Sequence, residues 1–210
     1  MITKLDETIL VTAAQWLAGQ DVGLALVLDK YGPPPLWARP ADFSTLVHII
    51  LEQQVSLASA NAAFQKLRAQ LGVVLPDSLL RLDDTTLRDM GFSRQKMLYT
   101  RLLAQAVTGG DLDLAQLEYL PDEAVRTALK RIKGIGDWTA DIYLSECLLR
   151  TDILPKGDIA MQEAFRVLNG LDKRPLHPDF EARTDHWRPW RSVGTRMLWH
   201  FYLCERGRAG

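Results

Sequence analysis

The sequence predicts an all-α protein, and three observations support this prediction. Apolar residues recur at helical spacing along most of the chain, residues that favour helix caps precede these stretches, and glycines or prolines follow them. The one strand candidate, residues 72–76, is too short to found a sheet. With 210 residues, 47% of them apolar, the chain is long enough for one or two compact lobes with a true core.

The predicted helices follow one another along the chain. The first begins near Ser44, a candidate N-cap, and runs as one long, mostly buried helix to Gly72. A second begins after Ser93 and ends at Gly109, and a third begins at Asp122. Further helices are expected at about 137–149, 158–169, 178–186 and 190–206.

Proline-rich connections divide these helices between two lobes. Residues 31–40 must be extended, because successive prolines disfavour helix, and residues 169–178 form a second irregular connection. We expect residues 43–150 to form one helical bundle. Residues 1–42 return to pack with residues 151–210 as the second helical lobe.

Composition excludes several classes of protein. No apolar run approaches the roughly 20 residues that a membrane-spanning helix needs, so we expect no membrane association. Acids near the start argue against a secretory signal. Cys147 and Cys204 are too few for a four-cysteine cluster or zinc site, and we expect reduced thiols in a cytoplasmic protein. A net charge of −1 argues against broad, nonspecific adhesion to nucleic acid.

The most informative segment is 129–140, with the sequence LKRIKGIGDWTA. Gly134 and Gly136 flank one isoleucine between two helices, permit the positive φ values of a tight reversal and leave backbone N–H groups uncovered. These groups lie beside the start of a helix, where unpaired donors and partial positive charge suit a phosphate. A glycine-capped helical corner is the plainer interpretation, but every charged residue from 124 to 136 is basic.

The whole pattern through Thr139 and Ala140 resembles the helix-hairpin-helix motif that binds the DNA backbone. This resemblance assigns DNA contacts to Lys133, Gly134, Ile135, Gly136, Asp137 and Thr139. In related hairpins the turn carbonyls hold a monovalent cation, Na⁺ or K⁺, here those of Lys130, Ile132 and Gly134. The motif also occurs in polymerases, ligases and structural DNA binders, so it indicates a ligand and not a reaction.

An aspartate downstream of the hairpin points to the reaction. Asp158 precedes a predicted helix and could serve only as its N-cap. The order of hairpin, Gly/Pro-rich loop and Asp158 resembles the HhH-GPD superfamily of DNA glycosylases, in which this aspartate is catalytic. Residues 49–56, residues 87–96, and residues 187–192 followed by Trp199 resemble further segments of its AlkA-type 3-methyladenine glycosylases. The resemblance covers about residues 43–205.

The resemblance implies a two-lobed helical HhH-GPD fold and a monofunctional DNA glycosylase that acts in base excision repair. Its expected substrate is double-stranded DNA containing alkylated purines such as 3-methyladenine and 7-methylguanine. Bifunctional members place a nucleophilic lysine where this chain has Trp138, so water is the expected nucleophile. Asp158 would stabilise the positive charge that develops on the deoxyribose. The alternatives are a non-catalytic binder of damaged DNA and a glycosylase for uracil or deaminated bases.

We also expect a monomer with no cofactor other than the hairpin cation, and no iron–sulfur cluster. Its site of work would be the cytoplasm, at the nucleoid if the source is a bacterium. DNA binding would depend on backbone amides, a helix start and a short basic run, which is compatible with the near-neutral net charge.

The resemblance assigns the base pocket to aromatic residues. Trp138 and Trp199 would face the flipped base, with packing in the core as the alternative. Ile142 and Ile159 stand where the AlkA-type family has tyrosines, which indicates a less aromatic pocket. The segment before residue 43 leaves no room for that family's β-rich N-terminal domain, and Trp37 is a candidate to replace an aromatic residue lost with it.

Two further contacts with DNA follow from the resemblance. The gap left by the flipped nucleotide would be filled from the corner Gln53–Gln54, where AlkA-type enzymes have leucine in the second position. Gln54 would be a polar plug able to bond the orphaned partner base, and a polar helix cap is the alternative. Lys96, in the second and shorter hairpin, would contact the DNA backbone.

Overall fold

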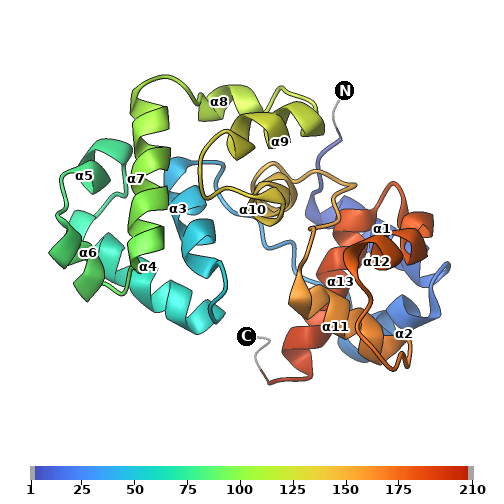
Figure 1. Cartoon of the computed structure of the whole chain (residues 1–210). Coiled ribbons are helices and arrows are strands. Elements are labelled where there is room, and N and C mark those ends of the chain that lie inside the picture. The colour runs from blue at the N-terminus through green and yellow to red at the C-terminus, as the bar shows by residue number, and fades with distance from the viewer. Residues whose placement is uncertain (1–2, 208–210) are drawn as a thin grey trace. The chain divides into compact units, whose positions relative to one another are not determined.

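The computed structural model describes residues 3–207, and these residues form helices joined by turns and loops, without a strand (Figure 1). The prediction of an all-α fold is therefore confirmed. The chain forms two compact units. One unit, Arg39–Cys147, is called the hairpin unit below. The other unit combines the stretch before Arg39 with the stretch after Cys147. It contains Asp158 and is called the aspartate unit below.

The hairpin unit is built around the long helix α7, which packs against α3 and α5. Ser93 caps the start of α7, and Gly109 follows its last residue, as predicted. The helix that was predicted to start at Asp122 also forms. The helices of this unit are α3 (Phe43–Glu52), α4 (Leu57–Leu71), α5 (Pro76–Leu80), α6 (Asp84–Asp89), α7 (Arg94–Thr108), α8 (Leu114–Leu117), α9 (Asp122–Lys130), α10 (Asp137–Ile142) and the π-helix η1 (Tyr143–Cys147).

The prediction of one long helix from Ser44 to Gly72 is wrong. The structure begins α3 after an Asp42 cap, ends it at Glu52 and starts α4 after Ser56. The break falls at Gln54, whose φ of +57° is a left-handed conformation that does not continue an α-helix. The apolar stripe passes through this corner because both helices bury one face in the same core.

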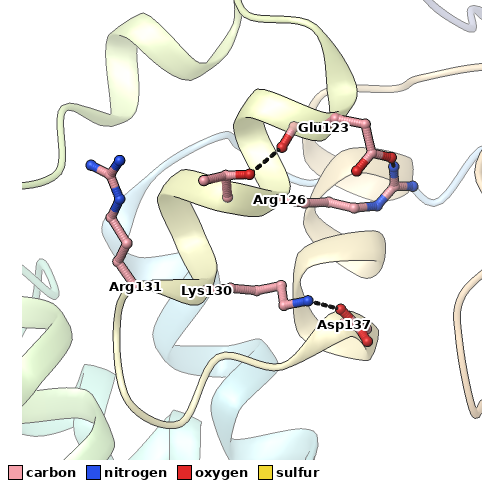
Figure 2. Close-up of a pocket in the computed structure, with 6 residues that line it drawn as sticks. Glu123, Arg126, Lys130, Arg131 and Asp137 are labelled. Carbon is pink, nitrogen blue, oxygen red and sulfur yellow. Dashed lines mark hydrogen bonds and ion pairs between the residues drawn. The ribbon is translucent and has the colours of Figure 1, made fainter.

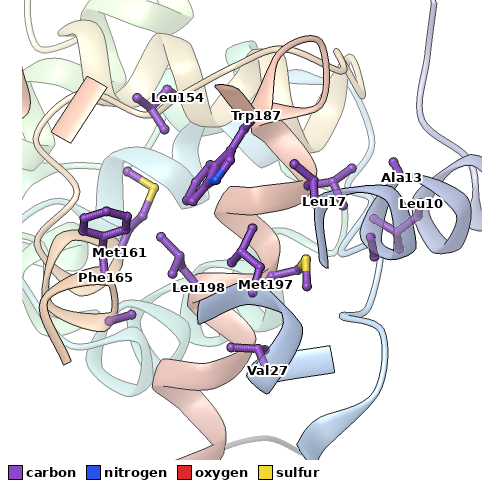
Figure 3. Close-up of a cluster of buried hydrophobic side chains, with 14 of the residues drawn as sticks. Leu10, Ala13, Leu17, Val27, Leu154, Met161, Phe165, Trp187, Met197 and Leu198 are labelled. Carbon is purple, nitrogen blue, oxygen red and sulfur yellow. The ribbon is translucent and has the colours of Figure 1, made fainter. Parts of the chain in front are cut away.

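The aspartate unit is built around α13, which packs against α1, α2 and α11. Figure 3 shows its core, in which Trp187 is fully buried and meets Phe165 and Phe180 edge-on at centroid distances of 6.2 and 6.3 Å. The N-terminal stretch joins this unit through the Leu5 N–H, which donates to the Leu149 carbonyl at 2.7 Å. Its elements are α1 (Glu7–Ala18), α2 (Val22–Tyr31), α11 (Ile159–Leu168), α12 (His177–Arg183), the 3₁₀-helix η2 (Asp185–Trp187) and α13 (Arg191–Cys204).

A buried charge network supports the start of the hairpin unit. Arg39 donates to both carboxylate oxygens of Glu52, at 3.1 and 2.8 Å, and lies 2.8 Å from Glu146. His48 stacks on Phe64 with ring centroids 4.2 Å apart, and its Nε2 lies 3.7 Å from Glu52. Burial lowers the pKa of His48 below its ordinary value; the Glu52 carboxylate opposes this shift and Arg39 adds to it.

This histidine is expected to make the fold sensitive to mild acid. Below a pH of about 6.5 the unfolded chain binds a proton at His48 more readily than the folded chain, so stability falls as the pH drops, by at most about 1.4 kcal/mol per pH unit. His48→Gln removes the group that binds this proton. Thermal melts from about pH 7 to about pH 5.5 should then show a smaller loss of stability in the variant than in the unchanged protein. Equal losses in the two proteins would contradict the assignment.

No helix within residues 3–207 has both the length and the apolar character needed to cross a membrane.

Candidate DNA-binding and catalytic site

The segment predicted as a hairpin reverses tightly between α9 and α10. Its turn is closed by two backbone hydrogen bonds, from the Ile132 N–H to the Leu129 carbonyl at 3.1 Å and from the Ile135 N–H to the Ile132 carbonyl at 3.0 Å. Ile132 and Ile135 are 8% and 5% exposed, so their side chains anchor the turn in the core of the hairpin unit. The turn therefore turns its isoleucines inward and leaves Lys133 and the Gly136 backbone exposed.

Gly134 occupies a position that only glycine can fill. Its φ is +101°, and a Cβ built on it would lie 2.1 Å from Cγ of Tyr99, on α7. The aromatic ring thus packs directly against the turn. Gly136 differs: it precedes α10 as its N-cap, supplies no capping side chain, and a Cβ there would meet no atom within 4 Å. The backbone at Gly136 is open to a ligand, and the backbone at Gly134 is supported from behind.

Charged side chains surround the start of α10. Figure 2 shows a groove over α9 that is lined by Glu123, Arg126, Thr127, Lys130, Arg131 and Asp137. Arg126 forms ion pairs with Glu123 and Asp141. The Lys130 ammonium forms an ion pair with Asp137 and so offsets the one acidic side chain in the first turn of α10. Lys133 is exposed on the turn. An anion that approaches α10 would meet the positive end of the helix dipole and exposed basic side chains.

Gln53 and Gln54, predicted together as the gap-filling corner, have different environments. The Gln53 side-chain amide donates to the Gly134 carbonyl and to Oγ1 of Thr139, both at 2.9 Å. Thr139 is 2% exposed. Gln54 is exposed and left-handed, with a φ of +57°. Of the two, Gln54 is the side chain presented to solvent.

Lys96 lies where it supports α3. Its ammonium donates to the carbonyl of Leu51, close to the C-terminal end of that helix, where a positive charge is favourable. Burial lowers the pKa of Lys96. The ammonium has two further protons, so the predicted contact with a phosphate is compatible with this position.

The predicted cation ligands are backbone carbonyls of the turn. The Ile132 carbonyl accepts from the Ile135 N–H, and the Gly134 carbonyl accepts from Gln53. A carbonyl oxygen has two lone pairs, so these hydrogen bonds leave each oxygen able to accept a further contact. The third predicted ligand is the Lys130 carbonyl. Within residues 3–207, no three His, Cys, Asp or Glu side chains are grouped as they would be around a metal ion.

Asp158 begins α11 in the aspartate unit. Its side chain is 8% exposed, and Oδ1 accepts from the Met161 N–H at 2.8 Å as the N-cap of the helix. The helix holds the carboxylate by this bond and places it at its own positive end. A carboxylate fixed in this way does not need to reorganise when positive charge develops on a substrate close to it.

Two of the predicted pocket residues meet in the aspartate unit. Trp37 packs edge-on against Trp199, with ring centroids 6.5 Å apart. Trp37 has a left-handed φ of +48°, which is rare for a bulky residue. The preceding residue, Leu36, is held by Arg196, which is fully buried and donates from Nε to the Leu36 carbonyl at 2.9 Å.

The other predicted pocket residues differ in exposure. Ile159, directly after Asp158, is 60% exposed. Ile142, in the hairpin unit, is only 3% exposed. Trp138 is half-buried in the first turn of α10.

Sequence reasoning missed Tyr99 and the second role of Gln53. Neither left a local signal, because their partners are 35 and more than 80 positions away in the sequence. The glycine at 134 was a partial signal, since a residue without a side chain permits close approach of another group.

Comparison with known proteins gives consistent matches. The family described as "HhH-GPD superfamily base excision DNA repair protein" matches residues 47–191. The YfjP protein of Bacillus subtilis, provisionally named a DNA-3-methyladenine glycosylase, is 27% identical over 184 residues, which are 84% of this chain and 64% of that protein. This chain thus spans less than two thirds of that relative.

Two fission-yeast proteins match over nearly their whole length. The alkylbase DNA glycosidase-like protein mag2 of Schizosaccharomyces pombe is 26% identical over 201 residues, 92% of this chain and 94% of its own. The solved structure of the 3-methyladenine DNA glycosylase Mag1 of the same yeast, in complex with abasic DNA, has a TM-score of 0.83 at 23% identity. That match covers 93% of this chain and 97% of Mag1, and it shows a shared fold.

Proposed function

Because the chain belongs to the HhH-GPD superfamily of base excision DNA repair proteins, we propose that it is a monofunctional DNA glycosylase that removes alkylated purines from double-stranded DNA. The names of YfjP and mag2 support this substrate class. The observation that most directly supports this reaction is the buried carboxylate of Asp158, which a hydrogen bond fixes at the start of α11. The protein works with the DNA that it repairs, which in a bacterium means the cytoplasm, at the nucleoid.

The reaction breaks the bond between C1′ of the deoxyribose and the purine nitrogen. The electron pair leaves with the base, and positive charge develops on the sugar. A carboxylate about 4 Å away at an effective dielectric near 20 stabilises that charge by about 4 kcal/mol, roughly a thousandfold in rate. Water then adds to C1′ and loses a proton, which leaves an abasic site. Trp138 stands in place of a nucleophilic lysine, so no covalent imine is formed there.

The expected substrates are bases that leave easily. Purines alkylated at N3 or N7 are cationic and depart as neutral molecules without a general acid. The base must first leave the duplex at a cost of a few kcal/mol, and stacking of a cationic base on an aromatic face returns about 0.5–2 kcal/mol. Trp37 and Trp199 provide such a surface in the aspartate unit, and Trp138, Ile142 and Ile159 are the other proposed pocket residues.

The hairpin is proposed to hold the DNA backbone. Backbone N–H groups at its turn and at the start of α10 face a phosphate, Lys133 and Lys96 add positive charge, and a Na⁺ or K⁺ ion on the turn carbonyls adds more. Gln54, exposed at its corner, fills the gap left by the flipped nucleotide.

Incubation with methylated duplex DNA, followed by identification of the released bases, tests this function. We expect release of 3-methyladenine and 7-methylguanine, with uracil and hypoxanthine released at least about a hundredfold more slowly. Uracil and hypoxanthine are uncharged in DNA, so without a general acid to protonate them they must leave as anions. Comparable release of neutral bases would overturn the substrate class. Binding of the methylated DNA without release of any base would favour a non-catalytic binder.

A further inference from the structure

We propose that Gln53 is a positioning residue that couples the DNA-binding hairpin to the gap-filling side chain Gln54. The inference rests on the proposed function, because it concerns two parts of the same DNA-binding surface within the hairpin unit. It gives Gln53 a role different from that of a second plug.

The first observation is the pair of hydrogen bonds from one amide group. Nε2 of Gln53 donates to the Gly134 carbonyl in the turn and to Thr139 Oγ1 in the first turn of α10, both at 2.9 Å. The two protons of the amide are therefore both used, and they join the turn to the helix that follows it. No other side-chain type offers two donors at this length without carrying a charge.

The second observation is the strained corner that starts at the same residue. Gln53 is the C-cap of α3, and the next residue, Gln54, adopts a φ of +57° although it is not glycine. Such a conformation costs about 1–3 kcal/mol and persists only where the surroundings hold it. On the N-terminal side of Gln54, Gln53 is hydrogen-bonded to the hairpin. On the C-terminal side, the Ser56 cap fixes the start of α4.

The end of α3 has one more support. The Lys96 ammonium donates to the Leu51 carbonyl, so the last turn of α3 is also fixed to α7. Between these supports, the two hydrogen bonds of the Gln53 amide link the corner to the hairpin. A phosphate bound at the turn and a side chain inserted at the corner would each favour the arrangement that the other needs, and such coupling is reciprocal.

The predicted consequence is a dependence of Gln54 on Gln53. Gln53→Met keeps the length of the side chain without its donors. Without these hydrogen bonds, Gln54 can leave its left-handed backbone conformation, and its side chain is then no longer positioned to enter the duplex. We expect excision of 3-methyladenine in a single turnover to slow about tenfold in this variant, while binding of undamaged duplex changes less than threefold.

A double-mutant cycle separates coupling from a merely structural role. The variants are Gln53→Met, Gln54→Ala and the two together, each assayed for single-turnover excision and for flipping with a fluorescent base analogue beside the lesion. With coupling, Gln54→Ala slows both steps in the wild-type background but changes them little in the Gln53→Met background. Effects that multiply independently would overturn the proposal.

Two further measurements keep the test decisive. If Gln53→Met does not fold, Thr139→Val removes one of the two acceptors and takes its place in the cycle. The matched variant is Thr139→Ser, which keeps the hydroxyl and in which the coupling to Gln54 should persist. If the unchanged protein releases no alkylpurine, the proposed function fails, and flipping of the fluorescent analogue alone then decides the coupling. Independent effects on flipping would in that case overturn it.

Discussion

Replacing Asp158 with asparagine is expected to slow release of 3-methyladenine roughly a thousandfold and to leave the fold intact. Asparagine caps helices about as well as aspartate, and its Oδ1 can accept from the Met161 N–H as the carboxylate does. The variant therefore removes the negative charge without removing the cap. Single-turnover excision from methylated DNA and a thermal melt measure the two effects separately.

Another capping aspartate in the same unit provides the matched control. Asp6 caps α1 through a 2.7 Å bond from the Ile9 N–H, and it lies on the exposed surface. Asp6→Asn should leave excision unchanged and should alter stability no more than Asp158→Asn does. Near wild-type excision by Asp158→Asn would exclude Asp158 from the reaction and leave it as a helix cap only.

The sequence predicted those parts of the fold whose cause is local. Ser93 and the glycines after residue 108 mark α7 because a cap and a helix end depend on residues a few positions apart. The same reasoning failed at Gln54, because no glycine or proline stands there, and Ser56, which caps α4, is a residue type that also occurs inside helices. The corner is held by Gln53, and the partners of Gln53 lie in the hairpin more than 80 positions later.

In the candidate site too, the features with a local cause were predicted and those that depend on distant residues were not. The two glycines of the hairpin predicted a tight turn with exposed backbone, and the turn forms. Their different roles depend on Tyr99, whose ring fills the space beside Gly134 and leaves Gly136 open. Likewise, the strained Trp37 follows Leu36, and the buried Arg196 that holds the Leu36 carbonyl is 160 positions from Leu36, so no spacing rule relates them.

Gly134→Ala is expected to damage the hairpin more than any other single-methyl change in it. The left-handed φ of +101° strains any side chain, and the added Cβ would stand 2.1 Å from the ring of Tyr99. Strain and overpacking together should lower the free energy of unfolding by about 2–4 kcal/mol. Chemical denaturation should show this loss, and duplex binding should fall with it because the turn can no longer close.

Gly136→Ala adds the same methyl group two residues away and separates fold from DNA contact. Gly136 has a φ of −99°, and an added Cβ would meet no protein atom within 4 Å, so the stability should change by less than about 0.5 kcal/mol. A phosphate seated against this backbone would meet the methyl group, and duplex affinity should then fall about tenfold at unchanged stability.

Wild-type affinity in Gly136→Ala would mean that DNA does not approach this backbone. The loss of binding in Gly134→Ala would then reflect only the broken turn. Both variants add one methyl group to the same turn, but only Gly134→Ala strains the backbone and meets the Tyr99 ring. The pair therefore tests whether the open backbone at the start of α10 is the DNA-binding surface.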